Sequence, residues 1–183
     1  MKIISTEFEG LYILEPSIFE DHRGYFMESY NYKVLNEAGI DYEFVQDNQS
    51  KSSYGVLRGL HFQNPPHAQT KLIRAVSGRI LDSVVDIRKS SPTYGKHFSI
   101  ELTADNKKQL LVPRGFAHGF SVLSENAEIL YKCDAYYNKE SEGGLMFNDP
   151  AFKIDWGIPE SKVLLSDKDK LYPSFKDFES EFE

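Results

Sequence analysis

The sequence predicts an all-β fold, a β-sandwich or barrel with only a few short helices. Segments of strand length, either apolar or alternating between apolar and polar residues, recur along the chain between Gly, Pro and Asn residues. Aromatic residues make up 14% of the chain, which also favours β structure. The expected strands are Leu11–Leu14, Val56–Phe62, Leu72–Val76, Ile80–Ile87, His97–Leu102, Gln109–Val112, Phe120–Leu123 and Ala127–Tyr136.

Helical patterns are scarce. The best internal candidate is Tyr32–Ala38, which Gly39 would end because glycine readily adopts the left-handed conformation found after helices. The tail Phe175–Phe182 would place its three phenylalanines on one helical face, so we expect it to dock as a short helix.

The bulk properties indicate one globular domain over residues 1–183, since no segment has the composition of a linker. The net charge of −7 argues against nucleic-acid binding, which needs a basic surface. No apolar run has the length of a membrane span, and the first residues lack the pattern of a signal peptide. The only cysteine, Cys133, cannot form an intrachain disulfide. We therefore expect a cytoplasmic protein that binds neither nucleic acid nor membrane.

Two short motifs resemble those of the cupin jelly roll. Metal-binding cupins carry G-x5-H-x-H followed by Glu, and later P-x-G-x2-H. Gly55 and His61 in GVLRGLHFQ match the start of the first motif, and Pro113, Gly115 and His118 in PRGFAHGF match the second. The resemblance implies a cupin-type jelly-roll β-sandwich.

The first motif departs from the metal-binding pattern. Gln63 occupies the place of its second histidine, and no Glu follows in Asn64–Lys71. First-row metals take three or four ligands, so His61 and His118 alone make a poor site, and we predict no metal. An imidazole without a metal suits proton transfer near neutral pH. No dinucleotide or phosphate-loop motif is present, so we expect no cofactor.

Ordered blocks of characteristic sequence run along nearly the whole chain: LEPSIFEDHRGYFMESY, FVQDNQSKS, GVLRGLHFQ, KLIRAVSGRILDSVVDIRKSSPTYG, LLVPRGFAHGFSVLSE, EILYKCDAYY, SEGG and LSDKD. Through these blocks the chain resembles the dTDP-4-dehydrorhamnose 3,5-epimerase family. The resemblance implies a homodimer without cofactor that acts on a dTDP-linked 4-keto-6-deoxy sugar in dTDP-L-rhamnose synthesis. The implied reaction inverts C3 and C5 of dTDP-4-dehydro-6-deoxy-D-glucose and gives dTDP-4-dehydro-L-rhamnose.

This chemistry requires a base, an acid on the opposite face and a group that stabilises the enolate. The 4-keto group acidifies the C–H bonds at C3 and C5. By the resemblance, His61 is the base, Asp169 orients its imidazole and Tyr131 is the opposite proton donor. Lys71, on a strand expected to line the barrel, would stabilise charge on O4. The purely structural alternatives are a turn or cap aspartate, a buried strand tyrosine and a solvated edge lysine.

The resemblance also implies the substrate-binding residues. Arg23, Arg58 and Lys168 would hold the phosphates, partly through the N-terminal segment of a neighbouring subunit, because guanidinium forks match phosphate oxygens. The remaining expected contacts are His118 to the sugar, Glu142 to the substrate, Glu28, Gln46 and Asn48 at the nucleotide end, and Tyr136 stacked on thymine.

Three alternatives stay open on the sequence. Relatives with the same base and tyrosine invert only C3 or only C5 of related sugar nucleotides. A metal-dependent cupin enzyme would use His61 and His118 as ligands. A non-catalytic cupin would bind the sugar nucleotide without turnover.

Overall fold

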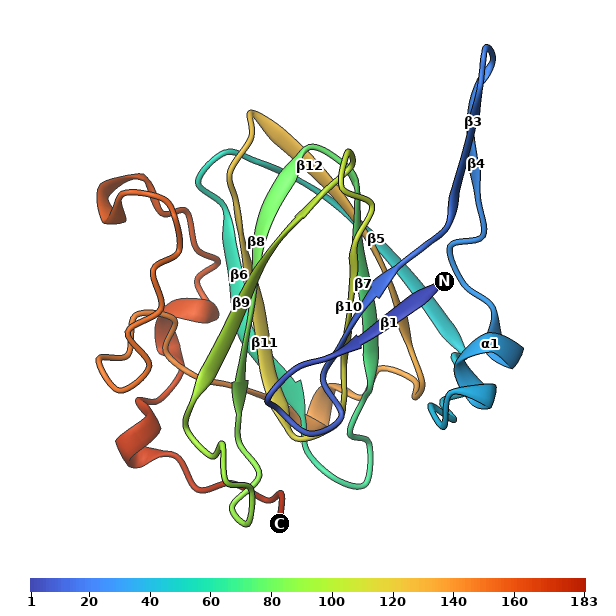
Figure 1. Cartoon of the computed structure of the whole chain (residues 1–183). Helices are drawn as coiled ribbons and strands as arrows, with labels where there is room; N and C mark the ends of the chain where they lie inside the picture. Colours follow the sequence, from blue (N-terminus) through green and yellow to red (C-terminus); the bar gives the residue numbers. More distant parts are fainter.

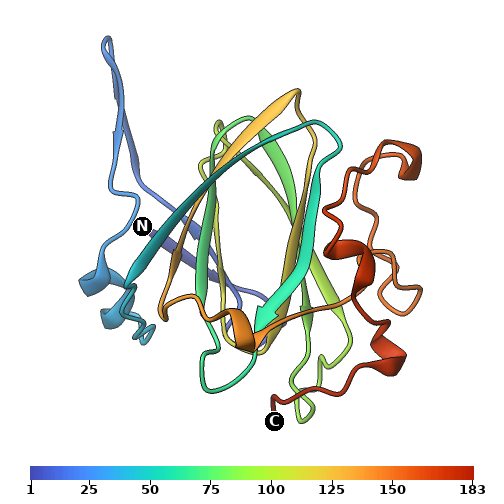
Figure 2. The same ribbon diagram turned by 180° about the vertical axis from the view of Figure 1, so that it is seen from behind.

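Two antiparallel β-sheets pack face to face around the centre of the molecule (Figures 1 and 2). The structure is a computed structural model that describes all 183 residues. The six-stranded sheet has the order β1 (Lys2–Ser5), β2 (Tyr12–Glu15), β10 (Gln109–Val112), β7 (Lys71–Ser77), β12 (Asn126–Cys133) and β5 (Gln46–Ser53). The five-stranded sheet has the order β13 (Glu142–Gly144), β6 (Leu57–Gln63), β11 (Phe116–Val122), β8 (Arg79–Asp86) and β9 (His97–Thr103). The predicted all-β jelly-roll sandwich is confirmed.

Smaller elements lie outside the sandwich. A hairpin of β3 (Ile18–Asp21) and β4 (Gly24–Met27) projects from the body beside the N-terminal strand (Figure 1). Single 3-10 turns follow late in the chain: η1 (Lys139–Ser141), η2 (Glu160–Lys162), η3 (Asp169–Leu171) and η4 (Phe175–Asp177). None of the helices has the length and hydrophobicity needed to cross a bilayer.

The only α-helix, α1, spans Tyr32–Glu37. The side chain of Asn31 caps its start by accepting a hydrogen bond from the Val34 amide. Ala38 is its C-cap, and Gly39 follows with φ of +81°. The helix predicted from this pattern is therefore confirmed, and glycine ends it as expected.

Alternation along the strands separates an interior core from two outer layers. Ile73 and Ala75 of β7 point into the space between the sheets, whereas Leu72 points outward against α1. The interior core is apolar and includes Phe8, from the loop between β1 and β2, together with Leu110 and other strand residues. Lys71 occupies the inward-facing row of β7 at its first residue and lines a cavity at that end of the sandwich.

The chain after β13 covers the outer face of the five-stranded sheet (Figure 1). Phe152, Trp156 and Phe182 are buried against strand residues such as Leu60 and Val85. The predicted docking of the tail is confirmed, but the predicted helix is wrong, because only the turn η4 forms. The tail's backbone bonds with the body instead: the Phe175 amide donates to Asp149 and the Phe182 carbonyl accepts from Lys89.

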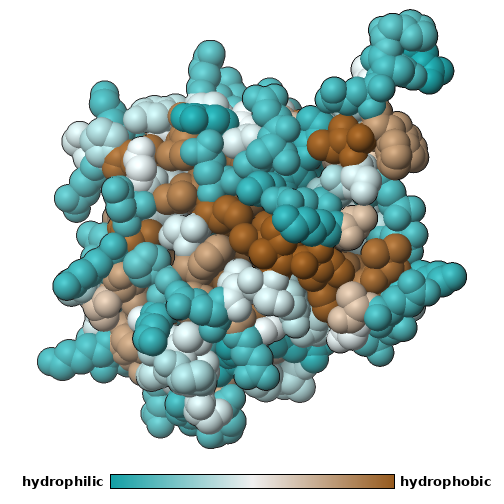
Figure 3. All heavy atoms as spheres, viewed as in Figure 1, coloured by the Kyte–Doolittle hydropathy of each residue, from teal (hydrophilic) through white to brown (hydrophobic).

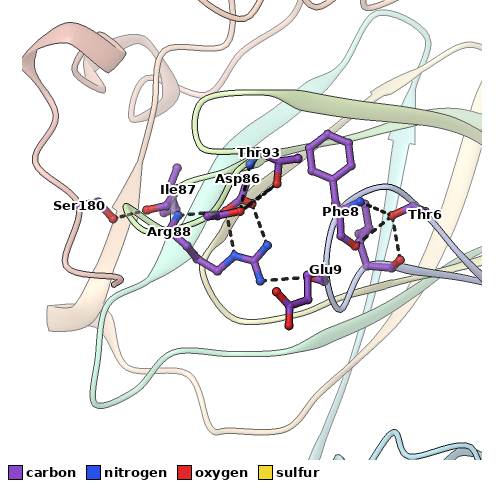
Figure 4. Close-up of polar contacts among 10 residues, drawn as sticks. Thr6, Phe8, Glu9, Asp86, Ile87, Arg88, Thr93 and Ser180 are labelled. Carbon is purple, nitrogen blue, oxygen red and sulfur yellow. Dashed lines mark hydrogen bonds and ion pairs between the residues drawn. The ribbon is translucent and has the colours of Figure 1, made fainter.

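A buried carboxylate fixes the loop between β8 and β9 (Figure 4). The side chain of Asp86 is 0% exposed and accepts two hydrogen bonds from the Arg88 guanidinium, at 2.9 and 2.7 Å. The hydroxyls of Ser91 and Thr93 each donate to the same carboxylate at 2.6 Å. Arg88 also donates to the carbonyl of Glu9, which ties the N-terminal segment to this loop. The Arg88 amide donates a fifth hydrogen bond to the Asp86 carboxylate, at 3.0 Å. These contacts are shielded, so they are stronger than surface ion pairs.

Replacing Asp86 with asparagine is expected to lower the free energy of unfolding by about 3 kcal/mol, because the mostly buried Arg88 charge loses its partner. Denaturant unfolding measures the change, and Asp105→Asn is the exposed control. Burial alone would raise the pKa of Asp86, but its hydrogen bonds outweigh that effect and hold the pKa below its ordinary value. This contribution is therefore present near neutral pH and is lost in acid, so the two proteins should converge in stability as pH falls. A constant difference down to the most acidic pH would contradict this account.

Candidate active site

A cavity of about 170 Å³ lies between the two sheets at one end of the sandwich. Five strands contribute to it, because inward-facing residues alternate along each strand. Among the residues expected to act on the substrate, those that line the cavity are Gln46 and Asn48 from β5, His61 from β6, Lys71 from β7, Tyr131 from β12 and Glu142 from β13. The polar cavity therefore gathers side chains that are up to 96 positions apart in sequence, from Gln46 to Glu142.

His61 is paired with a buried aspartate. Its Nε2 lies 2.5 Å from Oδ1 of Asp169, whose side chain is 4% exposed. Burial alone would raise the pKa of Asp169, but the hydrogen bond and charge of His61 outweigh it and lower the pKa. An ionised carboxylate only accepts, so the Nε2–H of His61 donates to it. The lone pair of the neutral imidazole is therefore on Nδ1, which is free to take a proton.

A β-bulge in β6 explains the sequence R-G-L-H. Arg58 pairs with Phe120 of β11 and His61 pairs with His118, so β6 carries one extra residue in this interval. Gly59 has φ of +121°, and a Cβ on it would lie 2.5 Å from Cα of Gly119. The two strands can approach this closely only because both residues are glycines. The bulge lets Arg58 reach inward to donate to the Ser52 hydroxyl at 3.2 Å.

Lys71 is a cation without an intramolecular partner. Its ammonium makes no hydrogen bond or ion pair with any residue of the chain. Burial lowers the pKa of Lys71, while the negative charges of Asp82 and Glu142 offset part of this effect. An ammonium aimed at a cavity with its donors unused is suited to bind an oxygen that becomes negative.

Tyr131 lies on β12, the strand next to β7, and belongs to the inward-facing row that also contains Ile129. Burial raises the pKa of Tyr131, and the charge of Arg58 offsets part of the rise. The phenol therefore keeps its proton at neutral pH. Its hydroxyl has no hydrogen-bond partner within the chain, so the proton is available to a bound molecule.

His118 forms a second histidine–aspartate pair behind His61. Its Nε2 lies 2.8 Å from Oδ1 of Asp82, and the Asp82 side chain is completely buried. Oδ2 of Asp82 has no hydrogen-bond partner. His118 does not line the cavity itself but is the cross-strand partner of His61.

Charged groups close the cavity near β13. Lys168 forms an ion pair with Glu142, and the Tyr137 hydroxyl donates to the same carboxylate at 2.9 Å. Burial alone would raise the pKa of Glu142, but these two hydrogen bonds outweigh it and lower the pKa. Across the cavity, the amide of Gln46 donates to Asn48 at 3.0 Å.

Six of the expected contact residues do not line the cavity: Arg23, Glu28, Arg58, His118, Tyr136 and Lys168. Arg23 lies in the turn of the projecting hairpin and pairs with Asp21, and Glu28 is exposed just after β4. Tyr136 is 70% exposed and does not line the cavity, whereas its neighbour Tyr137 does. Sequence reasoning missed Tyr137, whose only signal was its place beside Tyr136. It also missed two other residues, Gln69 at the cavity wall and Asp82 behind His118.

The side chain of Gln63 forms hydrogen bonds with the backbone of two neighbouring loops. Its amide donates to the His67 carbonyl at 2.6 Å and accepts from the Asn138 amide at 2.7 Å. The side chain at the usual place of a metal-binding histidine therefore braces two loops. No group of three or more His, Cys, Asp or Glu side chains is arranged to hold a metal ion.

Comparison with known proteins identifies the family. The family model described as dTDP-4-dehydrorhamnose 3,5-epimerase matches residues 5–177. The chain belongs to the dTDP-4-dehydrorhamnose 3,5-epimerase family. The enzyme of that name from Shigella flexneri is 54% identical over 170 residues, which cover 92% of this chain and 93% of the relative. The predictions of the family and of an epimerase are confirmed.

Solved structures of relatives support the epimerase fold. The Legionella pneumophila Philadelphia 1 enzyme in complex with dTDP-4-keto-L-rhamnose is 45% identical, with a TM-score of 0.93 and coverage of 97% of this chain and 94% of that one. A 3′-monoepimerase from Streptomyces bikiniensis in complex with dTDP-quinovose is 32% identical, with a TM-score of 0.87 and coverage of 93% and 86%. The same sandwich therefore serves both double and single epimerases.

Proposed function

We propose that this epimerase inverts C3 and C5 of dTDP-4-dehydro-6-deoxy-D-glucose by proton removal and return through an enolate. The observation that carries the proposal is the placement of an acid–base pair on opposite walls of one cavity. His61 belongs to the five-stranded sheet and Tyr131 to the six-stranded sheet. Inversion of a carbon needs proton removal from one face and delivery to the other, which this arrangement supplies.

His61 removes the proton in each half-reaction. Nδ1 takes the proton from the carbon next to the 4-keto group, and the bond electrons pass through the new C=C bond to O4. The ionised Asp169 stabilises the imidazolium that results. Lys71 donates to the negative O4, and Tyr131 delivers a proton to the opposite face. The His61 imidazolium releases its proton to solvent and the Tyr131 phenolate takes one from solvent, so both groups are restored for the second carbon. Solvent protonates that carbon directly where the phenol does not reach it.

The sugar nucleotide is expected to enter at the rim and extend outward. Arg58 and Lys168 would bind phosphate oxygens, for which Lys168 must exchange its contact with Glu142. Gln46 and Asn48 offer amide donors and acceptors to the nucleotide end, and the exposed rings of Tyr136 and Tyr137 are available to stack on thymine. Glu142 would contact the sugar, whereas His118 does not line the cavity, so we propose no direct sugar contact for it. The lone buried cysteine suits the reducing cytoplasm, where we place the reaction.

Incubation with the keto sugar nucleotide in D₂O tests the double inversion. Deuterium at both C3 and C5 of the product is expected, because each inversion exchanges one proton with solvent. Deuterium at one carbon alone would favour the single-epimerase alternative. Turnover that a chelator abolishes and added metal restores would favour the metal-dependent alternative. Binding without any deuterium incorporation would favour the non-catalytic one.

Tyr131→Phe is expected to separate exchange from inversion. His61 can still remove a proton and return one to the same face, so deuterium incorporation should continue. Formation of the inverted product should fall about 10²-fold because the opposite-face acid is lost. Nuclear magnetic resonance of the product mixture measures both. Equal loss of exchange and inversion would contradict this role.

The projecting hairpin supports a homodimer. Phe19 and Phe26 are direct cross-strand partners and are 64% and 69% exposed. The hairpin tip in Figure 3 is hydrophilic, and hydrophobic residues lie below it. A partner molecule would bury these rings and would place Arg23 and Glu28 at its own cavity.

Mixing two inactive variants tests this arrangement. Arg23→Ala and His61→Asn homodimers should each be impaired, whereas mixed dimers contain one site with both native residues. Recovery of activity on mixing, with light scattering at the dimer mass, is expected. No recovery in verified mixed dimers would show that Arg23 does not serve the partner's site.

A further inference from the structure

One turn of the C-terminal segment holds two side chains against His61. Asp169 begins the turn η3 and hydrogen-bonds to Nε2. Tyr172 ends the same turn, and its ring meets the His61 ring edge-on, with centroids 5.5 Å apart and planes at 65°. Such T-shaped contacts are favourable for aromatic pairs. The imidazole is therefore held at one nitrogen and along one side by residues three positions apart.

Gly144 makes room for the tyrosine ring. It is the cross-strand partner of His61 on β13, and a Cβ built on it would lie 2.5 to 2.6 Å from three atoms of the Tyr172 ring. Any larger residue would push the ring out of its place. The second glycine of S-E-G-G is therefore explained by the space that the Tyr172 ring needs beside His61, and not by the conformation of a turn.

The ring and not the hydroxyl makes these contacts. Oη of Tyr172 is buried and makes no hydrogen bond of ordinary geometry. Burial raises the pKa of Tyr172, and the nearby Lys168 ammonium offsets only part of the rise. The Lys168 ammonium lies 5.9 Å from the ring centroid. The turn is fixed on both sides, because the Asp169 amide donates to Ser166 and the Pro173 carbonyl accepts from Met146. Asp169 and Tyr172 are therefore held by the same anchored turn.

We propose that Tyr172 is a positioning residue for the epimerisation, whose ring confines the His61 imidazole to the orientation in which Nδ1 faces the substrate. Asp169 alone leaves the imidazole able to swing about its hydrogen bond. The Tyr172 ring blocks this movement of the imidazole by packing edge-on against it. The inference rests on the proposed function, because it gives Tyr172 a role only if His61 is the base.

Three variants at two positions test the ring. Tyr172→Leu is expected to lower kcat about 10- to 100-fold and to leave KM within about twofold, since misoriented catalytic groups slow the chemical step. Tyr172→Phe should restore kcat to within about threefold of the native value, because the hydroxyl makes no hydrogen bond of ordinary geometry. Tyr94→Leu is the matched control. Tyr94 also packs on the C-terminal segment, with its ring centroid 5.2 Å from that of Phe175, and it does not contact His61. Native kcat in Tyr172→Leu, or equal losses in the leucine and phenylalanine variants, would overturn the proposal.

A spectroscopic measurement separates this inference from the proposed function. In the native protein, the ¹⁵N spectrum of His61 should show one tautomer protonated at Nε2, and Tyr172→Leu should show mixed or exchange-broadened states. Gly144→Ala should do the same by displacing the ring, and it keeps the inference testable if the leucine variant does not fold. An unchanged spectrum in Gly144→Ala would overturn the inference. Full activity of His61→Asn would instead overturn the proposed function.

Discussion

Replacing His61 with asparagine is expected to lower kcat about 10³-fold, because the group that removes the proton is lost while the cavity keeps its shape. The asparagine amide ends near the position of Nδ1 and does not reach Asp169, so the carboxylate loses its histidine partner, and circular dichroism of the variant serves to verify that the fold is retained. KM should change little, since the phosphate and nucleotide contacts remain. Deuterium incorporation at C3 and C5 should fall in parallel with product formation, because both begin with the same proton removal.

His67→Asn is the matched control for this substitution. His67 lies in the loop just after β6 and its side chain is exposed, while only its backbone carbonyl contacts Gln63. Native kcat is expected for this variant. Proton exchange at the native rate in His61→Asn would mean that another group is the base.

Replacing Lys71 with methionine is expected to lower kcat about 10²-fold, because O4 of the enolate loses its only cationic donor from the cavity wall. Methionine keeps the length and apolar stem of lysine, so the loss reports on the charge. Since no residue of the chain is paired with this ammonium, its removal leaves no carboxylate unsatisfied. The variant should therefore be at least as stable as the native protein.

The pH dependence gives a second measurement for Lys71. Burial lowers the pKa of Lys71, so its ammonium loses its proton at a lower pH than an exposed lysine would. The native rate should accordingly fall on the alkaline side below the pH at which free lysine titrates, and Lys71→Met should lack this limb. Lys51→Met, at an exposed position on β5, should keep both the native rate and its pH profile. An unchanged alkaline limb in Lys71→Met would assign that limb to another group.

The sequence revealed most of the strands that carry an apolar face, and it missed the polar β5 and several short strands, such as β1. β10 was predicted at its observed bounds because all four of its residues are buried. β5 has the sequence QDNQSKSS, whose inward-facing residues are polar since they line the cavity and contact Arg58. A strand built to bind a polar ligand has no hydrophobic alternation to recognise. The hairpin of β3 and β4 was also missed. Its aromatic residues are exposed, so they do not contribute to the core of the sandwich.

The site residues that belong to a motif or to the family resemblance could be predicted. Those whose place in the site depends on tertiary contacts could not. Placement of His61, Lys71 and Tyr131 at one cavity agrees with the expected constellation, whose roles stay predictions. Tyr172 follows no pattern, since its contact with His61 arises from a turn more than a hundred positions later in the chain. Whether Tyr136 or Tyr137 faces the cavity likewise depends on how the chain leaves β12.

The long sequence separation between His61 and Asp169 affects the order in which the protein folds and becomes active. His61 and Asp169 are 108 positions apart, and the aspartate lies outside the sandwich, in the segment that follows β13. All thirteen strands precede that segment, so the sheets can pair while the ribosome is still adding the residues that activate the imidazole. Contacts of such range form late in folding. Recovery of turnover should therefore lag behind recovery of the β-sheet circular dichroism signal when the chain refolds.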